Sequence, residues 1–329
     1  MQNYKISIAM ATFEGRKFIK KQFESLLQQT RLPDEIIIYD DASSDDTVSI
    51  LKDLKKRAPF RVEIIQGSKN LGVNTAFVTA LAACNGTYIF FCDQDDVWEP
   101  KKIEMIVATF DSNPNIAMVF SNASQINENN ITLQMSLWEQ IKFNKKKIRN
   151  FEHNPLDQLL KGGNFIYGMS AAFRLESIKQ FSSIIKQDIG MTHDTWFALH
   201  VIGVGWKGVA LDEKLVRYRR HDWQNTSVNN INKVEGIQAR KEARRTQNFM
   251  LIKALEEVMN NILNATYVRS NKYKLETVRQ ISLKIQHLTL REKLRDSQNP
   301  LLGLRALVSK GYWQFAKGPV SVLRDLWGL

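Results

Sequence analysis

The sequence lacks the motifs that two common classes of nucleotide-binding domain require. No Gly-x-Gly-x-x-Gly follows the first β-rich run at 5–12, and the chain contains no Gly-x-x-x-x-Gly-Lys loop. In both classes, glycines allow the backbone to approach a phosphate group closely. A dinucleotide-binding Rossmann domain and a P-loop are therefore disfavoured.

Long apolar runs and cysteines are also scarce. The apolar stretch in MQNYKISIAMATF is about half the length of a membrane span and no cleavage site follows it, so we interpret it as a strand and not a signal peptide. No later run reaches ~20 apolar residues, so we expect no spanning helix. The two cysteines, Cys84 and Cys92, lie in apolar surroundings without metal-ligand spacing. We expect small core residues in a reducing compartment.

The positive charge of the chain is concentrated in its last third. The 329 residues carry a net charge of +12, and residues 231–329 alone hold 18 Lys plus Arg against 8 Asp plus Glu. Long polar helical patterns begin in the same region. We therefore predict one domain at 1–230 and a basic helical extension at 231–329.

Strand and helix patterns alternate through the first hundred residues. Apolar β-rich runs alternate with segments of helical spacing, which is typical of an α/β protein with a mostly parallel central sheet flanked by helices. The predicted strands are 5–12, 35–39, 61–66 and 87–92, and the predicted helices are 17–29, 47–57 and 74–83.

Three carboxylates follow the fourth predicted strand, in FFCDQDDVWEPKKIE. Asp93, Asp95 and Asp96 would repel one another unless a positive group lies between them. Magnesium or manganese suits oxygen ligands, and the phosphates of a substrate usually complete the coordination of such an ion. The cluster therefore predicts a cation and a phosphorylated ligand.

Other sites also contain Asp-x-Asp. An EF-hand loop would need Gly where Trp98 stands, and an aspartyl phosphatase would need Thr where Val97 stands. A polar turn after a buried strand has the same pattern. The ends of the first two strands are polar as well, at Thr12 and at Asp40–Asp41. In parallel sheets ligands bind beyond such carboxyl ends, so we expect the three strand ends to converge.

The last segment combines aromatic and leucine side chains with basic residues. In a continuous helix, Lys310, Lys317 and Arg324 would share one face, with a kink at Gly318–Pro319. An interfacial helix on an anionic membrane surface has this pattern. The same pattern is equally typical of a helix that packs on its own domain or on the second subunit of a homodimer.

A series of ordered motifs lies between 5 and 227. They are ATFEGRKFIKKQFESLLQQTRLPDEIIIYDDASSDDT, NLGVNTAF, FFCDQDDVWEPKKIE, GMSAAFRLE, MTHDTWFALH and LVRYRRHDWQNTS. Together these motifs resemble the family 2 glycosyltransferases with the GT-A fold, and the later ones are similar to those of the bacterial rhamnosyltransferase-like branch. This resemblance implies a nucleotide-diphospho-sugar donor of the dTDP or UDP type, Mn²⁺ or Mg²⁺, and inversion at the anomeric carbon.

The resemblance also implies roles on the donor side. Thr12, Glu14 and Asp41 would line the nucleotide pocket, with Asp41 accepting a hydrogen bond from the base imide. Asp93 would lie at the ribose. Asp95 would bind the metal, which neutralises charge as the diphosphate leaves.

On the acceptor side, Asp194 matches the catalytic base, which must remove a proton from the attacking hydroxyl. Taken alone, Thr-x-Asp before an apolar run is more typical of a helix cap. His193 would lie behind the base or contact the acceptor. Arg219 and His221 would contact the donor diphosphate, and His221 could add a metal ligand. Without the resemblance, their basic run would indicate a solvated face.

Two residues depart from the family pattern. Glu14 stands where Asn is common, and Ala42 stands where Gly commonly follows the paired aspartates. The first would alter the nucleotide pocket, and the second would change the turn slightly.

The expected function is transfer of a sugar, with rhamnose suggested by the branch, to a lipid-linked or oligosaccharide acceptor in cell-surface polysaccharide or lipopolysaccharide synthesis. We expect a cytoplasmic protein at the inner face of the membrane. Two alternatives remain. A nucleotidyltransferase would need a Gly-rich basic loop after the first strand, which 12–16 is not. A nucleic-acid-binding protein would interleave aromatic and basic residues, which the tail does not, so no nucleic acid is expected.

Overall fold

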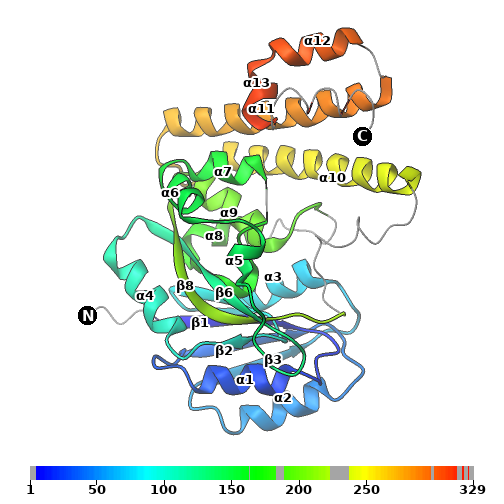
Figure 1. Ribbon diagram of the computed structural model, residues 1–329. Coiled ribbons are helices and arrows are strands. Elements are labelled where there is room, and N and C mark those ends of the chain that lie inside the picture. The colour runs from blue at the N-terminus through cyan, green and yellow to red at the C-terminus, as the bar shows by residue number, and fades with distance from the viewer. Residues whose placement is uncertain are drawn as a thin grey trace.

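An eight-stranded sheet forms the centre of the protein in the computed structural model (Figure 1). The structure describes residues 5–162, 164–182, 189–222, 237–297, 300–316, 321 and 325. The strands run in the spatial order β3-β2-β1-β4-β7-β6-β8-β5. Their bounds are β1 Ile6–Thr12, β2 Glu35–Asp40, β3 Arg61–Gln66, β4 Tyr88–Cys92, β5 Val97–Trp98, β6 Ile116–Ile126, β7 Ala171–Arg174 and β8 Lys207–Arg219.

The first half of the sheet is parallel. Strands β3, β2, β1 and β4 pair in parallel, and all residues of β2 and β4 are buried, which explains their continuous apolar sequence. The second half is mixed: β7 is antiparallel to both β4 and β6, while β6 and β8 are parallel. The predicted α/β class and the four predicted strands are confirmed.

Helices cover both faces of the sheet (Figure 1). One core cluster joins the sheet to α1 (Ile19–Leu27), α2 (Thr47–Lys55) and α4 (Lys102–Ser112). The other joins it to α3 (Val73–Ala83), α8 and α9. Cys84 and Cys92 are buried and unpaired, as expected. The remaining elements of this part are α5 Leu137–Gln140, α6 Lys145–His153, α7 Pro155–Lys161, the 3₁₀ turn η1 Gly168–Ser170, α8 Leu175–Ser182 and α9 His193–Gly203.

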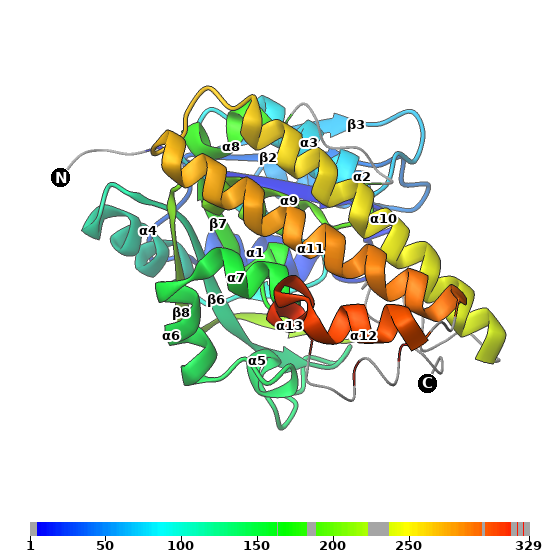
Figure 2. The same ribbon diagram turned by 90° about the horizontal axis from the view of Figure 1, so that it is seen from above.

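Two long helices extend across the domain. Helices α10 (Ile237–Leu263) and α11 (Asn271–Ser297) lie side by side over α9 (Figure 2). Buried residues of α10, including Val258 and Ile262, belong to the same core as α9. The extension is helical, as its pattern predicts. The predicted boundary at 230/231 lies in 223–236, outside the described residues.

The tail forms two short helices, α12 (Pro300–Val308) and α13 (Lys310–Phe315). They are separated at Ser309, whose hydroxyl accepts from Tyr312 N–H at 3.3 Å, so the tail is not one continuous helix. The Tyr312 side chain is buried, with its ring 4.8 Å from that of His287 on α11.

This part of the tail therefore packs on its own chain. Lys317, Arg324 and the side chain of Lys310 lie outside the described residues. In the described part of the chain, no helix combines the length and apolar character that crossing a membrane requires.

Candidate donor and acceptor site

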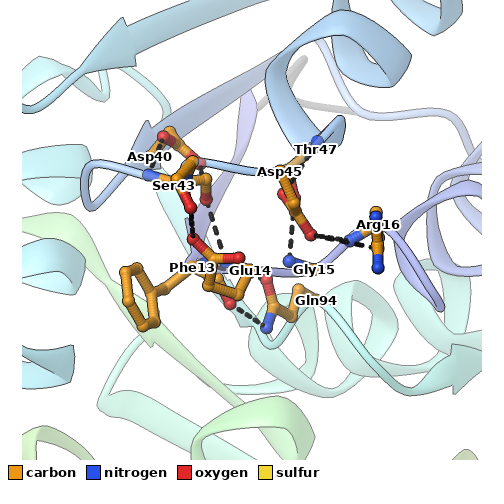
Figure 3. Close-up of polar contacts among 10 residues, drawn as sticks. Phe13, Glu14, Gly15, Arg16, Asp40, Ser43, Asp45, Thr47 and Gln94 are labelled. Atoms are coloured by element: carbon orange, nitrogen blue, oxygen red, sulfur yellow. Dashed lines mark hydrogen bonds and ion pairs between the residues drawn. The ribbon is translucent and has the colours of Figure 1, made fainter.

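The loop after β1 is held by side chains from two other strand ends (Figure 3). Its four consecutive backbone N–H groups, from Phe13 to Arg16, all donate to side-chain oxygens. The acceptors are Gln94 Oε1 at 2.9 Å, Ser43 Oγ at 2.9 Å, Thr47 Oγ1 at 2.8 Å and Asp45 Oδ2 at 3.2 Å. Gln94 also donates back to the Phe13 carbonyl at 2.8 Å. The three strand ends thus converge, as predicted, and their loops fix one another.

Both departures from the family pattern lie in the left-handed backbone region. The φ angle of Glu14 is 50° and that of Ala42 is 65°. Asn and Gly, the residues common at these two positions, tolerate this region better than other residues. The Glu14 carboxylate accepts from the Ser44 N–H at 2.7 Å and from the Ser44 hydroxyl at 2.9 Å, so it stabilises the turn that contains Ala42.

We expect Ala42→Gly to raise the free energy of unfolding by about 0.5 kcal/mol. A left-handed alanine costs roughly 1–2 kcal/mol, part of which the greater freedom of glycine in the unfolded chain offsets. Denaturant unfolding would measure the change. Ala83→Gly, at the last residue of α3 where φ is not positive, is the control. It should lower stability by less than the roughly 1 kcal/mol that glycine costs in a helix interior. A loss of stability in Ala42→Gly as well as in Ala83→Gly would contradict the idea that the left-handed backbone at Ala42 is strained.

The two residues expected at the nucleoside are buried at the ends of β1 and β2. Thr12 Oγ1 donates to Asp40 Oδ2 at 2.9 Å. The Asp41 carboxylate accepts from the N–H groups of Leu71 and Gly72, both at 2.7 Å. A carboxylate has about four lone-pair sites, so Asp41 retains capacity for another donor.

The acidic cluster divides into one structural and two site-facing carboxylates. Asp96 is fully buried, and its Oδ1 accepts from Arg219 N–H at 2.9 Å. Among the described residues, its Oδ2 has no hydrogen-bond partner. Asp93 and Asp95 are half-buried. Asp95 Oδ2 lies 2.8 Å from His221 Nε2.

A buried lysine that the sequence analysis missed lies behind this cluster. Lys102 on α4 is fully buried, with Nζ 3.5 Å from the centre of the Trp98 ring and donating to the Met169 carbonyl. Burial lowers the pKa of Lys102 to about 7, against the opposing effect of Asp93 and Asp96. Burial and the charges of Asp95 and Asp194 raise the pKa of Asp93 to about 7. The missed signal was a lysine at a position that the helical pattern assigns to the core.

Asp194 lies in the first turn of α9, beside Asp93. Its Oδ2 accepts from Gly168 N–H at 2.8 Å, and its Oδ1 accepts from Thr195 N–H at 2.5 Å. The backbone of the next residue, Met169, acts in the opposite sense to burial and lowers the pKa of Asp93. The short turn η1 therefore lies against the carboxylates of both halves of the predicted site.

His193 lies behind Asp194 in an aromatic environment. Its ring is stacked on Phe77, with 4.0 Å between centroids, and neither ring nitrogen has a hydrogen-bond partner within the described residues. Burial lowers the pKa of His193, so the imidazole is neutral. A neutral ring enclosed in this way supports the backbone from which Asp194 extends.

Arg219 has protein partners where the sequence analysis expected donor phosphates. Its guanidinium donates from Nε to the Asp95 carbonyl at 2.6 Å, from Nη1 to the Asn127 and Glu128 carbonyls at 3.0 and 3.2 Å, and from Nη2 to Asn130 Oδ1 at 2.8 Å. The residue is 1% exposed. Arg219 therefore fastens the loop 127–130 to the acidic cluster, and its contact with phosphate stays a prediction.

Asp95 and His221 can contribute to a metal site without completing one. Within the described residues, no group of three or more His, Cys, Asp or Glu side chains is arranged to hold an ion. Magnesium and manganese are commonly held by one or two carboxylates while substrate phosphates supply further oxygens. The pair at the rim of the site, with side chains 18% and 6% exposed, fits that donor set.

The sequence matches a family of known proteins over more than half of its length. Residues 7–180 match Glycosyl transferase family 2. An *Escherichia coli* protein, "UDP-Glc:alpha-D-GlcNAc-diphosphoundecaprenol beta-1,3-glucosyltransferase WfgD", is 30% identical over 145 residues, which are 44% of this chain and 56% of that protein. The chain spans 35% to 68% of the lengths of the first three curated relatives that it matches.

Solved structures share the fold. *Staphylococcus aureus* TarS 1–349 in complex with UDP-GlcNAc aligns with a TM-score of 0.58 at 16% identity, over 98% of this chain and 80% of that one. The mannosyltransferase PcManGT from *Pyrobaculum calidifontis*, in complex with GDP-Man and Mn²⁺, aligns with a TM-score of 0.53 at 14% identity, over 99% and 88%. These neighbours confirm the GT-A architecture.

Proposed function

The chain belongs to glycosyltransferase family 2, and from this premise we propose that it transfers a sugar from a nucleotide-diphospho-sugar to a saccharide acceptor with inversion at the anomeric carbon. One observation carries the proposal. Asp194, the base candidate, accepts from the Gly168 amide of η1 and lies close enough to Asp93, on the donor side, for its charge to raise the pKa of Asp93. Such an arrangement holds an acceptor hydroxyl and a donor sugar next to each other.

On the donor side, Thr12, Glu14 and Asp41 line the nucleotide pocket, and Asp93 binds the ribose. Asp41 accepts from the base imide with the capacity left by its two backbone contacts. Asp95 and His221 would hold Mn²⁺ or Mg²⁺, and the bound ion would supply positive charge at the diphosphate. The Mn²⁺ complex of the *Pyrobaculum* mannosyltransferase supports this choice of ion.

Arg219 acts on the same side by holding Asp95 and the loop 127–130. Four of the five N–H groups of its guanidinium bind backbone carbonyls and Asn130, so contact with the diphosphate would compete with these bonds. The loop of residues 13–16 also bears on the alternative of a nucleotidyltransferase. Its four N–H groups are bonded to side chains, so they are not available to bind a triphosphate.

On the acceptor side, Asp194 accepts the proton of the attacking hydroxyl. General-base catalysis of this kind requires a carboxylate within hydrogen-bond reach of the hydroxyl. The hydroxyl attacks the face of the sugar opposite to the departing diphosphate, which inverts the anomeric carbon. The proton transfer therefore needs only the Asp194 carboxylate of the chain itself.

The donor is of the UDP or dTDP type in this proposal. The *Escherichia coli* relative is named for UDP-Glc and a diphosphoundecaprenol-linked acceptor, and TarS was solved with UDP-GlcNAc. Rhamnose stays among the candidate sugars. We propose a lipid-linked or oligosaccharide acceptor in cell-surface polysaccharide or lipopolysaccharide synthesis. The basic extension, with 18 basic and 8 acidic residues, would bring a cytoplasmic protein to the anionic inner membrane face or to a second subunit.

A thermal-shift panel tests the proposal directly. The protein would be heated with UDP-glucose, UDP-N-acetylglucosamine, dTDP-rhamnose and GDP-mannose, each with and without Mn²⁺. We expect one uridine or thymidine donor to raise the melting temperature, more strongly with Mn²⁺, because a ligand that binds only the folded state stabilises it. GDP-mannose is the control for the nucleobase, because it carries guanine in place of uracil or thymine. An unchanged melting temperature with every donor at millimolar concentration would contradict the proposal.

A further inference from the structure

A buried side chain connects helix α3 to the segment that precedes Asp194. Asn74, in the first turn of α3, is 4% exposed. Its Nδ2 donates to the Met191 carbonyl at 3.1 Å, and its Oδ1 accepts from His193 N–H at 2.9 Å. Both ends of one amide therefore bind the backbone of a segment more than a hundred residues away. His193 is the first residue of α9, so its N–H is one of the donors that a helix cannot satisfy internally.

The same turn of α3 is fixed from the opposite side. Asp41 accepts from the N–H groups of Leu71 and Gly72, which immediately precede the helix. Phe77, one turn along α3 from Asn74, stacks on the His193 ring with 4.0 Å between centroids. The N-terminal turn of α3 thus contacts both the residue expected at the nucleoside and the start of α9.

We propose that Asn74 is a positioning residue, which sets the start of α9 so that the Asp194 carboxylate meets the acceptor hydroxyl. This inference rests on the proposed function, in which Asp194 is the base. The carboxylate lies one residue beyond the amide that Asn74 binds, so rotation of the first turn of α9 moves it directly. A displacement of about 1 Å in a catalytic group can lower a rate roughly a hundredfold.

The contact depends on the two different ends of the amide. Asn74→Ala would leave the buried His193 N–H and the Met191 carbonyl without their partner. Asn74→Asp keeps an acceptor for His193 N–H but sets a carboxylate against the Met191 carbonyl. The first variant therefore removes both contacts, and the second removes one at nearly constant shape.

The experiment compares both variants with Thr79→Ala on the same helix. Thr79 Oγ1 donates to the Thr75 carbonyl at 2.8 Å, so its loss removes a hydrogen bond within α3 and none to α9. With the donor from the thermal-shift panel, we expect kcat of Asn74→Ala to fall about 10- to 100-fold. The donor KM should stay within about twofold, since Asp41 keeps its contacts with the Leu71 and Gly72 amides. The kcat of Asn74→Asp should lie between that of Asn74→Ala and that of the wild type.

Hydrogen exchange of peptides covering 189–195 gives a readout independent of activity. In Asn74→Ala this segment should exchange faster while the rest of α9 keeps its protection, because His193 N–H loses its acceptor. An unchanged kcat in Asn74→Ala, or an equal fall of kcat in Thr79→Ala, would overturn the role of Asn74 even where the wild type transfers sugar. A wild type that transfers no sugar would overturn the proposed function and this role together. If Asn74→Ala fails to fold, kcat and hydrogen exchange of 189–195 are measured on Asn74→Asp. Wild-type values of both in Asn74→Asp would then overturn the role of Asn74.

Discussion

Replacing Asp194 with Asn should lower the rate of sugar transfer by about a thousandfold while donor binding is kept. General-base catalysis contributes typically 10²- to 10⁴-fold, and an amide cannot accept the proton of the acceptor hydroxyl. Asn keeps one oxygen for either the Gly168 or the Thr195 amide, so a modest loss of stability should accompany the change. Initial rates, the donor-dependent thermal shift and the melting temperature would separate these effects.

A matched control exists in the first turn of α7. Asp157 occupies a similar helical position and pairs with Lys161 at 2.6 Å, outside the candidate site. Asp157→Asn should retain transfer within about twofold, because the Asp157–Lys161 pair joins two residues of α7 and takes no part in the proposed chemistry. Transfer by Asp194→Asn at a rate near that of Asp157→Asn would contradict the assignment of the base.

Replacing Asp95 with Ala should remove both sugar transfer and the part of the thermal shift that depends on Mn²⁺. Its carboxylate and His221 Nε2 lie 2.8 Å apart, and the charge of a diphosphate would otherwise be added to that of Asp93 and Asp95. His221→Ala should weaken the Mn²⁺ effect in the same direction. Titration of Mn²⁺ at fixed donor concentration would measure both variants.

The control for Asp95 is an exposed aspartate of the same domain. Asp53 on α2 pairs with Lys56 and its side chain is 73% exposed. Asp53→Ala should leave the Mn²⁺ response unchanged. A full Mn²⁺-dependent shift in Asp95→Ala would show that the ion binds elsewhere, and the proposed metal pair would then be wrong.

Local sequence patterns were enough for the parallel half of the sheet. In β2 and β4 an apolar run is followed directly by an aspartate, whereas β1 and β3 mix apolar with polar residues. Helical spacing marks the helices between the strands. The convergence of the ends of β1, β2 and β4 follows from this order alone, since parallel strands end at one edge. Asp194 could be recognised only through the family resemblance, because in local sequence it has the pattern of a helix cap.

Long-range contacts account for what the sequence left unpredicted. The partners of Arg219 lie some 90 or 124 residues away, so its binding to the loop 127–130 has no local signal. The side chain of Asn74 binds across 117 and 119 residues. The break between α12 and α13 depends on a capping serine within an apolar run, where periodicity alone favoured one helix.

The consecutive residues Gly168 and Met169 bear on how specificity can be engineered in this protein. The Gly168 amide donates to Asp194, and the backbone of Met169 lowers the pKa of Asp93, so one short turn next to the sheet acts on both carboxylates. Grafting new loops onto the sheet should therefore change which substrates are joined while the anomeric configuration of the product stays the same.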